Sequence, residues 1–411
     1  MRRLFLFAAV CALAGCSDPS HPSGQAQQGQ KGLPAAKVAA PPQAPAPVVP
    51  ASPSQALALD DHQPGVDAVA ASDENTTVRE AAAEPPAAAP ADASGVPASP
   101  LAQAIDQADL SASGKPPSGW TVKGVDPALI KLEVLLDRAG FSPGVIDGKD
   151  GQNLKQALAA YASAKGMDEQ AARTAPCRPT PAPAAQVYAI SQADEAGPFI
   201  GDPPKDYEAL SKLPALSYST PLQLLAEKFH MDQKLLQALN PGADFSQAGA
   251  TIVVAAPRTA PRAFQVARIE VDKSSEAVRA YDASGALVAY YPATVGSTER
   301  PAPSGMFKVI AVAPHPAYFY DPKRLTFTPQ GAKGKLRIAP GPNNPVGETW
   351  IALNIPTYGI HGAPDPTLIG KVQSHGCVRL TNWDAVELGQ AVKKAVKKGV
   401  KVDFVGAEKK A

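Results

Sequence analysis

Short apolar runs recur through the last third of the chain and predict β-strands. Each run either alternates apolar and polar positions with a period of two, which turns one face of a strand toward a core, or is apolar throughout. The runs lie at 264–271, 277–281, 287–291, 306–312, 350–353 and 400–405, with turn residues such as those at 282–285 between them. The pattern predicts a mainly β domain, a sheet or sandwich, over residues 263–406. One helix is expected within it, beginning at Asn382 and ending at Gly399.

An earlier stretch has helical spacing instead. Asp126 is a capping carboxylate followed by Pro127, and leucines then recur at intervals of three or four residues before Gly140. A second apolar helix runs through Tyr161. These features predict a small all-α domain over residues 119–168.

A second helical stretch is followed by a strand. Thr220 and Pro221 form a capping arrangement, and Asp232 caps a further helix. The apolar run at 252–254 has the length and β-branched composition of a strand. The order strand, helix, helix, strand predicts a small α+β domain over residues 213–258.

Two stretches show neither the spacing of apolar residues typical of a helix nor the alternation typical of a strand. Residues 17–118 and 169–212 are rich in alanine and proline, and such segments cannot bury enough apolar surface to offset chain entropy. We expect the first to be a disordered tether and the second a linker. Cys177 lies in this linker, either as a free thiol with no role in chemistry or as a disulfide partner that masks Cys377.

Residues 1–16 have the pattern of an export signal. Arg2 and Arg3 precede a short apolar run that leads to Cys16. The run is shorter than the roughly 20 residues that a membrane-spanning helix takes. We therefore expect the chain to be exported rather than to be held by a transmembrane helix at this end.

The length of the chain bears on the number of domains, and its net charge bears on the kinds of partner it could bind. The chain has 411 residues, which predicts two or three domains, and a net charge of +1. This charge balance gives no reason to expect nucleic-acid binding.

The candidate chemistry lies between residues 361 and 382. Cys377 follows His375 and Gly376, and His361 precedes Gly362. A thiolate attacks a carbonyl carbon, an imidazole takes the thiol proton, and glycines let backbone N–H groups approach an oxyanion. A zinc site is the alternative, but the stretch lacks a second cysteine or carboxylate at ligand spacing. We expect neither a metal nor a cofactor.

This stretch resembles the signature of the L,D-transpeptidases of bacterial cell walls. Segments at 303–307 and 341–347 extend the resemblance upstream. It implies that Cys377 is the nucleophile and that His361 is the base, with its other nitrogen held by the Gly362 carbonyl. The remaining roles that it implies are an oxyanion loop at Ser374, His375 and Gly376, and loop-ordering or substrate-binding side chains at Arg379 and Asn382.

Three other parts resemble modules of wall-associated proteins. Residues 119–168 resemble a peptidoglycan-binding helical domain, and residues 213–258 resemble a lysin motif. Residues 13–16 resemble the lipoprotein cleavage box. These resemblances imply a periplasmic protein anchored by a lipid on Cys16, at the outer membrane of a Gram-negative bacterium, with peptidoglycan as its partner. Either small domain could instead be a spacer without a glycan ligand.

The implied reaction is a two-step acyl transfer. Cys377 attacks a tetrapeptide stem and D-alanine leaves. An amine of a second stem gives a 3→3 cross-link, a lipoprotein lysine gives an anchored lipoprotein, and water makes the enzyme a carboxypeptidase or amidase. A different class stays open: a non-catalytic, tethered peptidoglycan-binding protein. We expect a monomer in either case.

Overall fold

The computed structural model describes residues 99–112, 114–174, 182–258, 262–297, 301–322, 334–372 and 376–407. The predicted signal with Cys16, the predicted tether up to residue 98, Cys177, Ser374 and His375 lie outside these ranges. Within the described ranges, no helix is long and apolar enough to cross a membrane.

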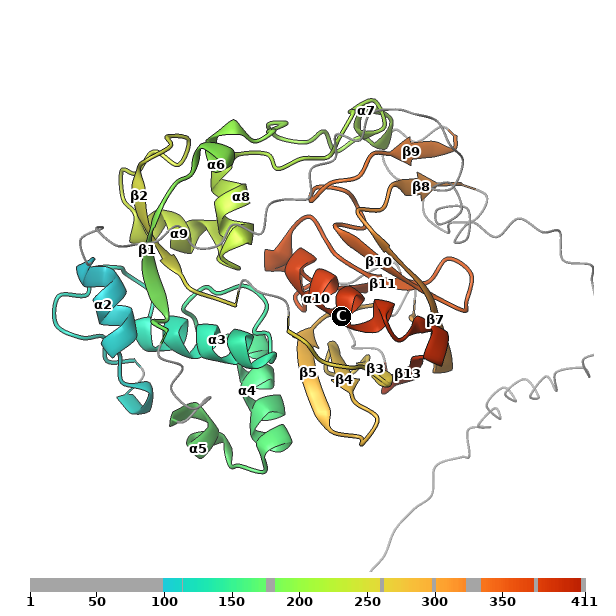
Figure 1. Ribbon diagram of the computed structural model, residues 1–411, viewed down its shortest axis with the longest axis horizontal. Helices are drawn as coiled ribbons and strands as arrows, with labels where there is room; N and C mark the ends of the chain where they lie inside the picture. Colours follow the sequence, from blue (N-terminus) through green and yellow to red (C-terminus); the bar gives the residue numbers. More distant parts are fainter. Residues whose placement is uncertain are drawn as a thin grey trace, which may run out of the picture. The chain divides into compact units, whose positions relative to one another are not determined.

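A nine-stranded sheet organises the C-terminal part of the chain (Figure 1). Its order is β5-β4-β3-β13-β7-β10-β11-β12-β6. In chain order the strands are β3 (Arg268–Asp272), β4 (Ala277–Tyr281), β5 (Leu287–Pro292), β6 (Thr294–Val295), β7 (Gly305–Pro314), β10 (Thr349–Leu353), β11 (Gly359–His361), β12 (Val378–Arg379) and β13 (Lys401–Val405). The pairs β3–β13 and β11–β12 are parallel, and the other neighbours are antiparallel. The predicted mainly β domain is confirmed.

The long strand β7 joins the two halves of this sheet. Its first residues pair with β13, and the rest pair with β10. Strands of both halves contribute β-branched side chains, such as Ile269 and Ile351, to one hydrophobic cluster. Alternating burial along β3 follows the alternating sequence pattern.

Helix α10 (Asn382–Lys393) covers part of this core beside β7 and β10 (Figure 1). Thr381 caps it by accepting a hydrogen bond from the Asp384 N–H, and Leu388 and Val392 face the core. The predicted helix to Gly399 is too long. The chain turns into the 3-10 helix η3 (Val396–Lys398), which ends at Gly399 in the left-handed conformation.

The stretch with helical spacing forms α3 (Pro127–Ala139) and α4 (Gln152–Lys165). The Asp126 carboxylate accepts a hydrogen bond from the Ala128 N–H, and Gly140 ends α3 with a φ of 84°. The helical region is larger than the sequence indicates. It also includes α2 (Pro100–Gln107) and η1 (Leu110–Ala112) from the predicted tether, and α5 (Glu169–Thr174) from the predicted linker.

The second small region is built on a two-stranded antiparallel sheet. Its elements are β1 (Ala185–Ala189), α6 (Gln192–Ala196), α7 (Tyr207–Leu210), α8 (Pro221–Lys228), α9 (Gln233–Leu239) and β2 (Thr251–Ala255). Strand β1 pairs with β2 although it lies in the predicted linker. Its partner lies far away in the sequence, so no local pattern marks it.

The helical region packs against the nine-stranded sheet. Phe141 packs edge-on against Tyr161, with ring centroids 5.2 Å apart, in a cluster that includes Tyr290 of β5. Backbone hydrogen bonds also join Gly140 and Ser142 to Tyr290. The hairpin of β8 (Tyr318–Tyr320) and β9 (Leu336–Ile338) and the short η2 (Pro366–Leu368) complete the described elements.

Candidate active site

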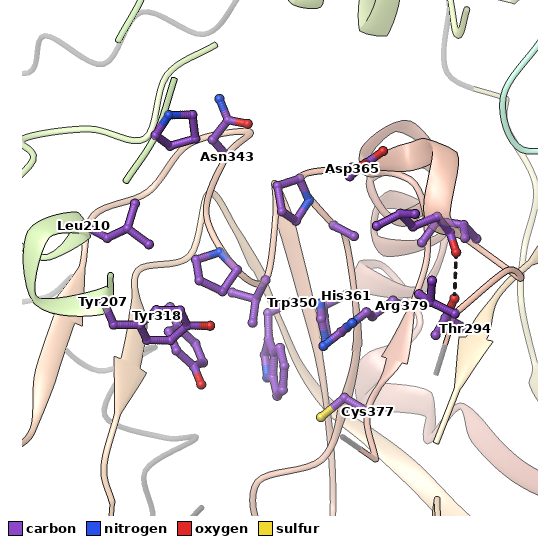
Figure 2. Close-up of a pocket in the computed structure, with 18 of the residues that line it drawn as sticks. Tyr207, Leu210, Thr294, Tyr318, Asn343, Trp350, His361, Asp365, Cys377 and Arg379 are labelled. Carbon is purple, nitrogen blue, oxygen red and sulfur yellow. Dashed lines mark hydrogen bonds between the residues drawn. The ribbon is translucent and has the colours of Figure 1, made fainter. Parts of the chain in front are cut away.

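A pocket of about 600 Å³ is lined by the ends of β11 and β12 (Figure 2). Cys377, His361 and Arg379 contribute to its wall together. Trp350 of β10 and Tyr318 of β8 add aromatic surface. A concave site with apolar walls and a few polar groups is the usual form of an active site.

The parallel pairing of β11 and β12 brings the two reactive residues together. Ile360 lies opposite Val378, and His361 lies opposite Arg379. Cys377 directly precedes β12, and His361 is the last residue of β11. Residues 16 positions apart in the sequence therefore reach one edge of the pocket. The Cys377 side chain is half-buried, and its Sγ lies 3.6 Å from the Thr357 carbonyl oxygen.

The His361 ring is held in one orientation. It is buried, and its Nδ1 lies 2.6 Å from the Gly362 carbonyl oxygen. A carbonyl only accepts hydrogen bonds, so Nδ1 carries the proton and the Nε2 lone pair is left to act as a base. The Trp350 ring stacks on the imidazole, with centroids 5.3 Å apart and an interplanar angle of 21°.

Burial sets the charge of both groups. It lowers the pKa of His361 to about 3, and the nearby Arg379 guanidinium lowers it further, against the opposing hydrogen bond to Gly362. Burial raises the pKa of Cys377, although a backbone hydrogen bond from Gly359 and the positive charge of Arg379 act the other way. Both shifts favour the uncharged forms, a neutral thiol and a neutral imidazole, near pH 7.

Gly376 allows the backbone to pass closely beside Tyr358. Its φ is 117°, and a Cβ at this position would lie 2.9 Å from the Tyr358 hydroxyl oxygen. A side chain would meet both strain and a clash. Glycine at position 376 therefore lets the backbone that precedes Cys377 lie against Tyr358. The N–H groups expected to face an oxyanion belong to this stretch of backbone.

The two side chains expected to order the loop or to bind substrate occupy different places. Arg379 lines the pocket. Asn382 is 3 % exposed and bonds to protein groups, including the Glu348 N–H and the Pro342 carbonyl. Asn382 therefore orders loops beside the pocket, whereas the Arg379 side chain can face a substrate.

Part of the pocket wall comes from a segment that sequence reasoning missed. Lys205, Tyr207 and Leu210 line the pocket from the predicted linker. The Tyr207 ring packs edge-on against Tyr318 and Tyr320, with centroids 6.0 and 6.1 Å away. Nothing in the local sequence marks this segment, because its partners belong to the β8–β9 hairpin.

Among the residues that the structure describes, no group of three or more histidine, cysteine, aspartate or glutamate side chains could hold a metal ion. The polar groups that line the pocket include the Cys377 thiol, the His361 imidazole and the Arg379 guanidinium.

Comparison with known proteins gives one consistent family. The YkuD family model, the L,D-transpeptidase catalytic domain, matches residues 266–403. The chain is 31% identical over 176 residues to YkuD of Bacillus licheniformis, an inferred L,D-transpeptidase, covering 42% of this chain and 87% of that protein. It is 41% identical over 70 residues to YkuD of Bacillus subtilis, covering 17% of this chain and 43% of that protein. A solved L,D-transpeptidase structure from Xylanimonas cellulosilytica aligns with 71% of this chain and 100% of that chain, at 16% identity and a TM-score of 0.31.

Proposed function

The chain belongs to the YkuD family of L,D-transpeptidases, and from this premise we propose that it transfers an acyl group between peptidoglycan stem peptides through Cys377. The observation that carries the proposal is the juxtaposition of Cys377 and His361 at the ends of two paired strands, in one pocket. The fixed Nδ1 of His361 supports it, because the ring then presents a basic nitrogen.

The first half of the reaction forms a thioester. Cys377 Sγ attacks the carbonyl that joins the L-centre of diaminopimelate to D-alanine, and His361 Nε2 takes the thiol proton. Backbone N–H groups at Gly376 and Cys377 stabilise the oxyanion. The C–N bond then breaks, and His361 gives its proton to the departing D-alanine amine.

The second half releases the product. An acceptor amine attacks the thioester carbonyl and gives a proton to His361, the C–S bond breaks, and the thiol regains its proton. A stem-peptide amine produces a 3→3 cross-link, and a lipoprotein lysine produces an anchored lipoprotein. Water in place of the amine would make the same acyl-enzyme a hydrolase.

Acylation by a carbapenem tests this proposal directly. We expect the full chain to gain the mass of one inhibitor, on the peptide that contains Cys377. A chain that stays unmodified, yet binds peptidoglycan in a sedimentation assay, would favour the non-catalytic wall-binding alternative.

The low pKa of His361 predicts a flat pH profile for this acylation. An imidazole with an ordinary pKa of about 6.5 loses about 25-fold of its neutral form between pH 7 and pH 5. His361, with a pKa of about 3, stays neutral over this range. We expect the acylation rate, followed by mass spectrometry, to change by less than about twofold. A hundredfold fall would instead indicate attack by a thiolate formed in solvent, without help from His361.

Because Tyr207 lines the pocket, we expect its replacement to weaken substrate binding more than it slows the chemical step. Tyr207→Ala removes a ring that contacts Tyr318 and Tyr320 but does not touch the reacting groups. We expect KM for the donor peptide to rise about fivefold with kcat within about twofold, because the lost contact is made equally in ground and transition states. Tyr207→Phe keeps the ring and is the matched control. A fall in kcat with KM unchanged would contradict this role.

The N-terminal parts have proposed roles that rest on the sequence. We propose export, lipidation at Cys16 and outer-membrane anchoring, with the tether giving the enzyme reach to the wall. The pairing of β1 with β2, with α8 and α9 between them in the chain after α6 and α7, supports a lysin-motif-like region. The packing of α3 and α4 against β5 supports a structural role for the helical region.

A further inference from the structure

Glu227 is a buried carboxyl outside the residues that the family model matches. It lies in α8 and is 8 % exposed. Its Oε2 accepts a hydrogen bond from Asn382 Nδ2 at 3.0 Å, and its Oε1 accepts one from Gln223 Nε2 at 3.3 Å. Burial raises its pKa to about 8, and the nearby Glu348 carboxylate also raises it, so the group is mainly neutral at pH 7. Burying a carboxyl is unfavourable, and this one forms a hydrogen bond from α8 to the first residue of α10.

The Asn382 amide has a partner for each of its polar groups. Nδ2 donates to Glu227 and to the Pro342 carbonyl at 3.1 Å, and Oδ1 accepts from the Glu348 N–H at 3.2 Å. Turning the amide over would oppose donor to donor at the Glu348 N–H and acceptor to acceptor at the Pro342 carbonyl. These two contacts set the direction in which the Asn382 oxygen points, and the bond to Glu227 adds to them in holding the amide in place.

The Asn382 Oδ1 atom lies close to the backbone of two glycines, Gly347 and Gly362. A Cβ at Gly347 would lie 2.1 Å from Asn382 Oδ1, and a Cβ at Gly362 would lie 2.4 Å from it. The two turns also lie close together, because a Cβ added at Gly362 would lie 3.3 Å from the Gly347 Cα. Only glycine at both positions lets the amide and the turns approach this closely.

The chain of contacts ends at the base. The Gly362 carbonyl is the group that fixes His361 Nδ1. We propose that Glu227 is a positioning residue for His361, acting through the Asn382 amide and the Gly362 turn. The proposal rests on the proposed function, because that function makes His361 the base.

A second set of hydrogen bonds joins α8 to the loop that precedes β10. Gln223, also in α8, exchanges amide hydrogen bonds with Asn343 at 3.0 and 3.2 Å. Asn343 further donates to the Ser217 carbonyl at 2.7 Å. The loop before β10 is thus held at one end through Asn343 and at the other through Asn382. The region around α8 is part of the support of the active site.

The test compares Glu227→Ala, Glu227→Gln and a matched control in the full chain. Gln156→Ala is the control, because Gln156 also joins the helical region to the sheet, through the Ser275 carbonyl and the Tyr290 hydroxyl, away from His361. We expect Glu227→Ala to lower the maximal carbapenem acylation rate about tenfold, with the inhibitor concentration for half-maximal rate unchanged. Glu227→Gln keeps an acceptor for Asn382 and should stay within about threefold of the parent. Gln156→Ala should keep the parent rate.

A second readout does not depend on activity. Nitrogen NMR of the histidine rings, with His361 assigned by its loss in His361→Ala, reports which ring nitrogen carries the proton. We expect the Nδ1–H form in the parent and in Glu227→Gln, and a mixture of tautomers in Glu227→Ala. An unchanged tautomer and an unchanged acylation rate in Glu227→Ala would overturn the positioning role while leaving the proposed function intact. No acylation of the parent chain would refute the function, and the NMR comparison would still decide the positioning of His361.

Discussion

Replacing Cys377 with alanine is expected to abolish both the thioester and all transfer to amines. A thiol can form a covalent acyl intermediate with a carbonyl and then release it, and Cys377 lines the pocket. Loss of a covalent nucleophile typically costs about 10⁶-fold in rate, and here no transfer step can follow without the thioester. The measurement is product formation from tetrapeptide muropeptides, together with the intact mass of the protein.

The matched control for this variant is Cys177→Ala, which removes a cysteine of the predicted linker. We expect it to keep the parent rate. The melting temperature of Cys377→Ala should stay close to that of the parent, because the half-buried side chain loses little packing. Near-normal turnover by Cys377→Ala would remove the proposed mechanism.

Replacing His361 with alanine is expected to slow acylation of Cys377 by about 10²- to 10⁴-fold. Burial makes the free thiol a weak acid, so without a base few molecules hold a thiolate at pH 7. The variant should also change the pH profile. Its residual rate should rise about tenfold for each pH unit below the thiol pKa, whereas the parent rate is expected to be flat between pH 5 and pH 7.

His315→Ala is the matched control for the base. His315 is half-exposed, pairs with Glu348 at 2.5 Å, and does not line the pocket. Glu348 raises the pKa of His315, in contrast to the lowered pKa of His361. We expect His315→Ala to acylate within about threefold of the parent. An His361→Ala variant that acylates as fast as the parent would exclude His361 as the base.

Local signals predicted what local chemistry decides. Asp126 and Gly140 mark the two ends of α3, because a cap and a left-handed glycine act within one turn of the helix. The period of two marked the strands of the catalytic sheet, since alternate residues face its core. Side-chain types and neighbouring glycines marked the stretch around Cys377, and the family resemblance singled out His361 as the expected base; the structure places both residues in one pocket.

Long-range pairing decided what the sequence could not predict. Strand β1 obtains its hydrogen bonds from β2, and Tyr207 obtains its place from Tyr318. The parallel pairing of β11 with β12 likewise depends on the whole sheet. Asn382 shows the same limit: its residue type is compatible with substrate binding, but its buried partners come from α8 and from the loop before β10.

The most direct test of the central claim is mass spectrometry of purified tetrapeptide muropeptides incubated with the full chain. The account predicts dimers that have lost one D-alanine for each new bond, formed by the parent and absent with Cys377→Ala. Loss of D-alanine without dimers would identify hydrolysis, or an acceptor missing from the assay. Unchanged muropeptides, with no acyl group on Cys377, would contradict the claim that this chain is an acyltransferase.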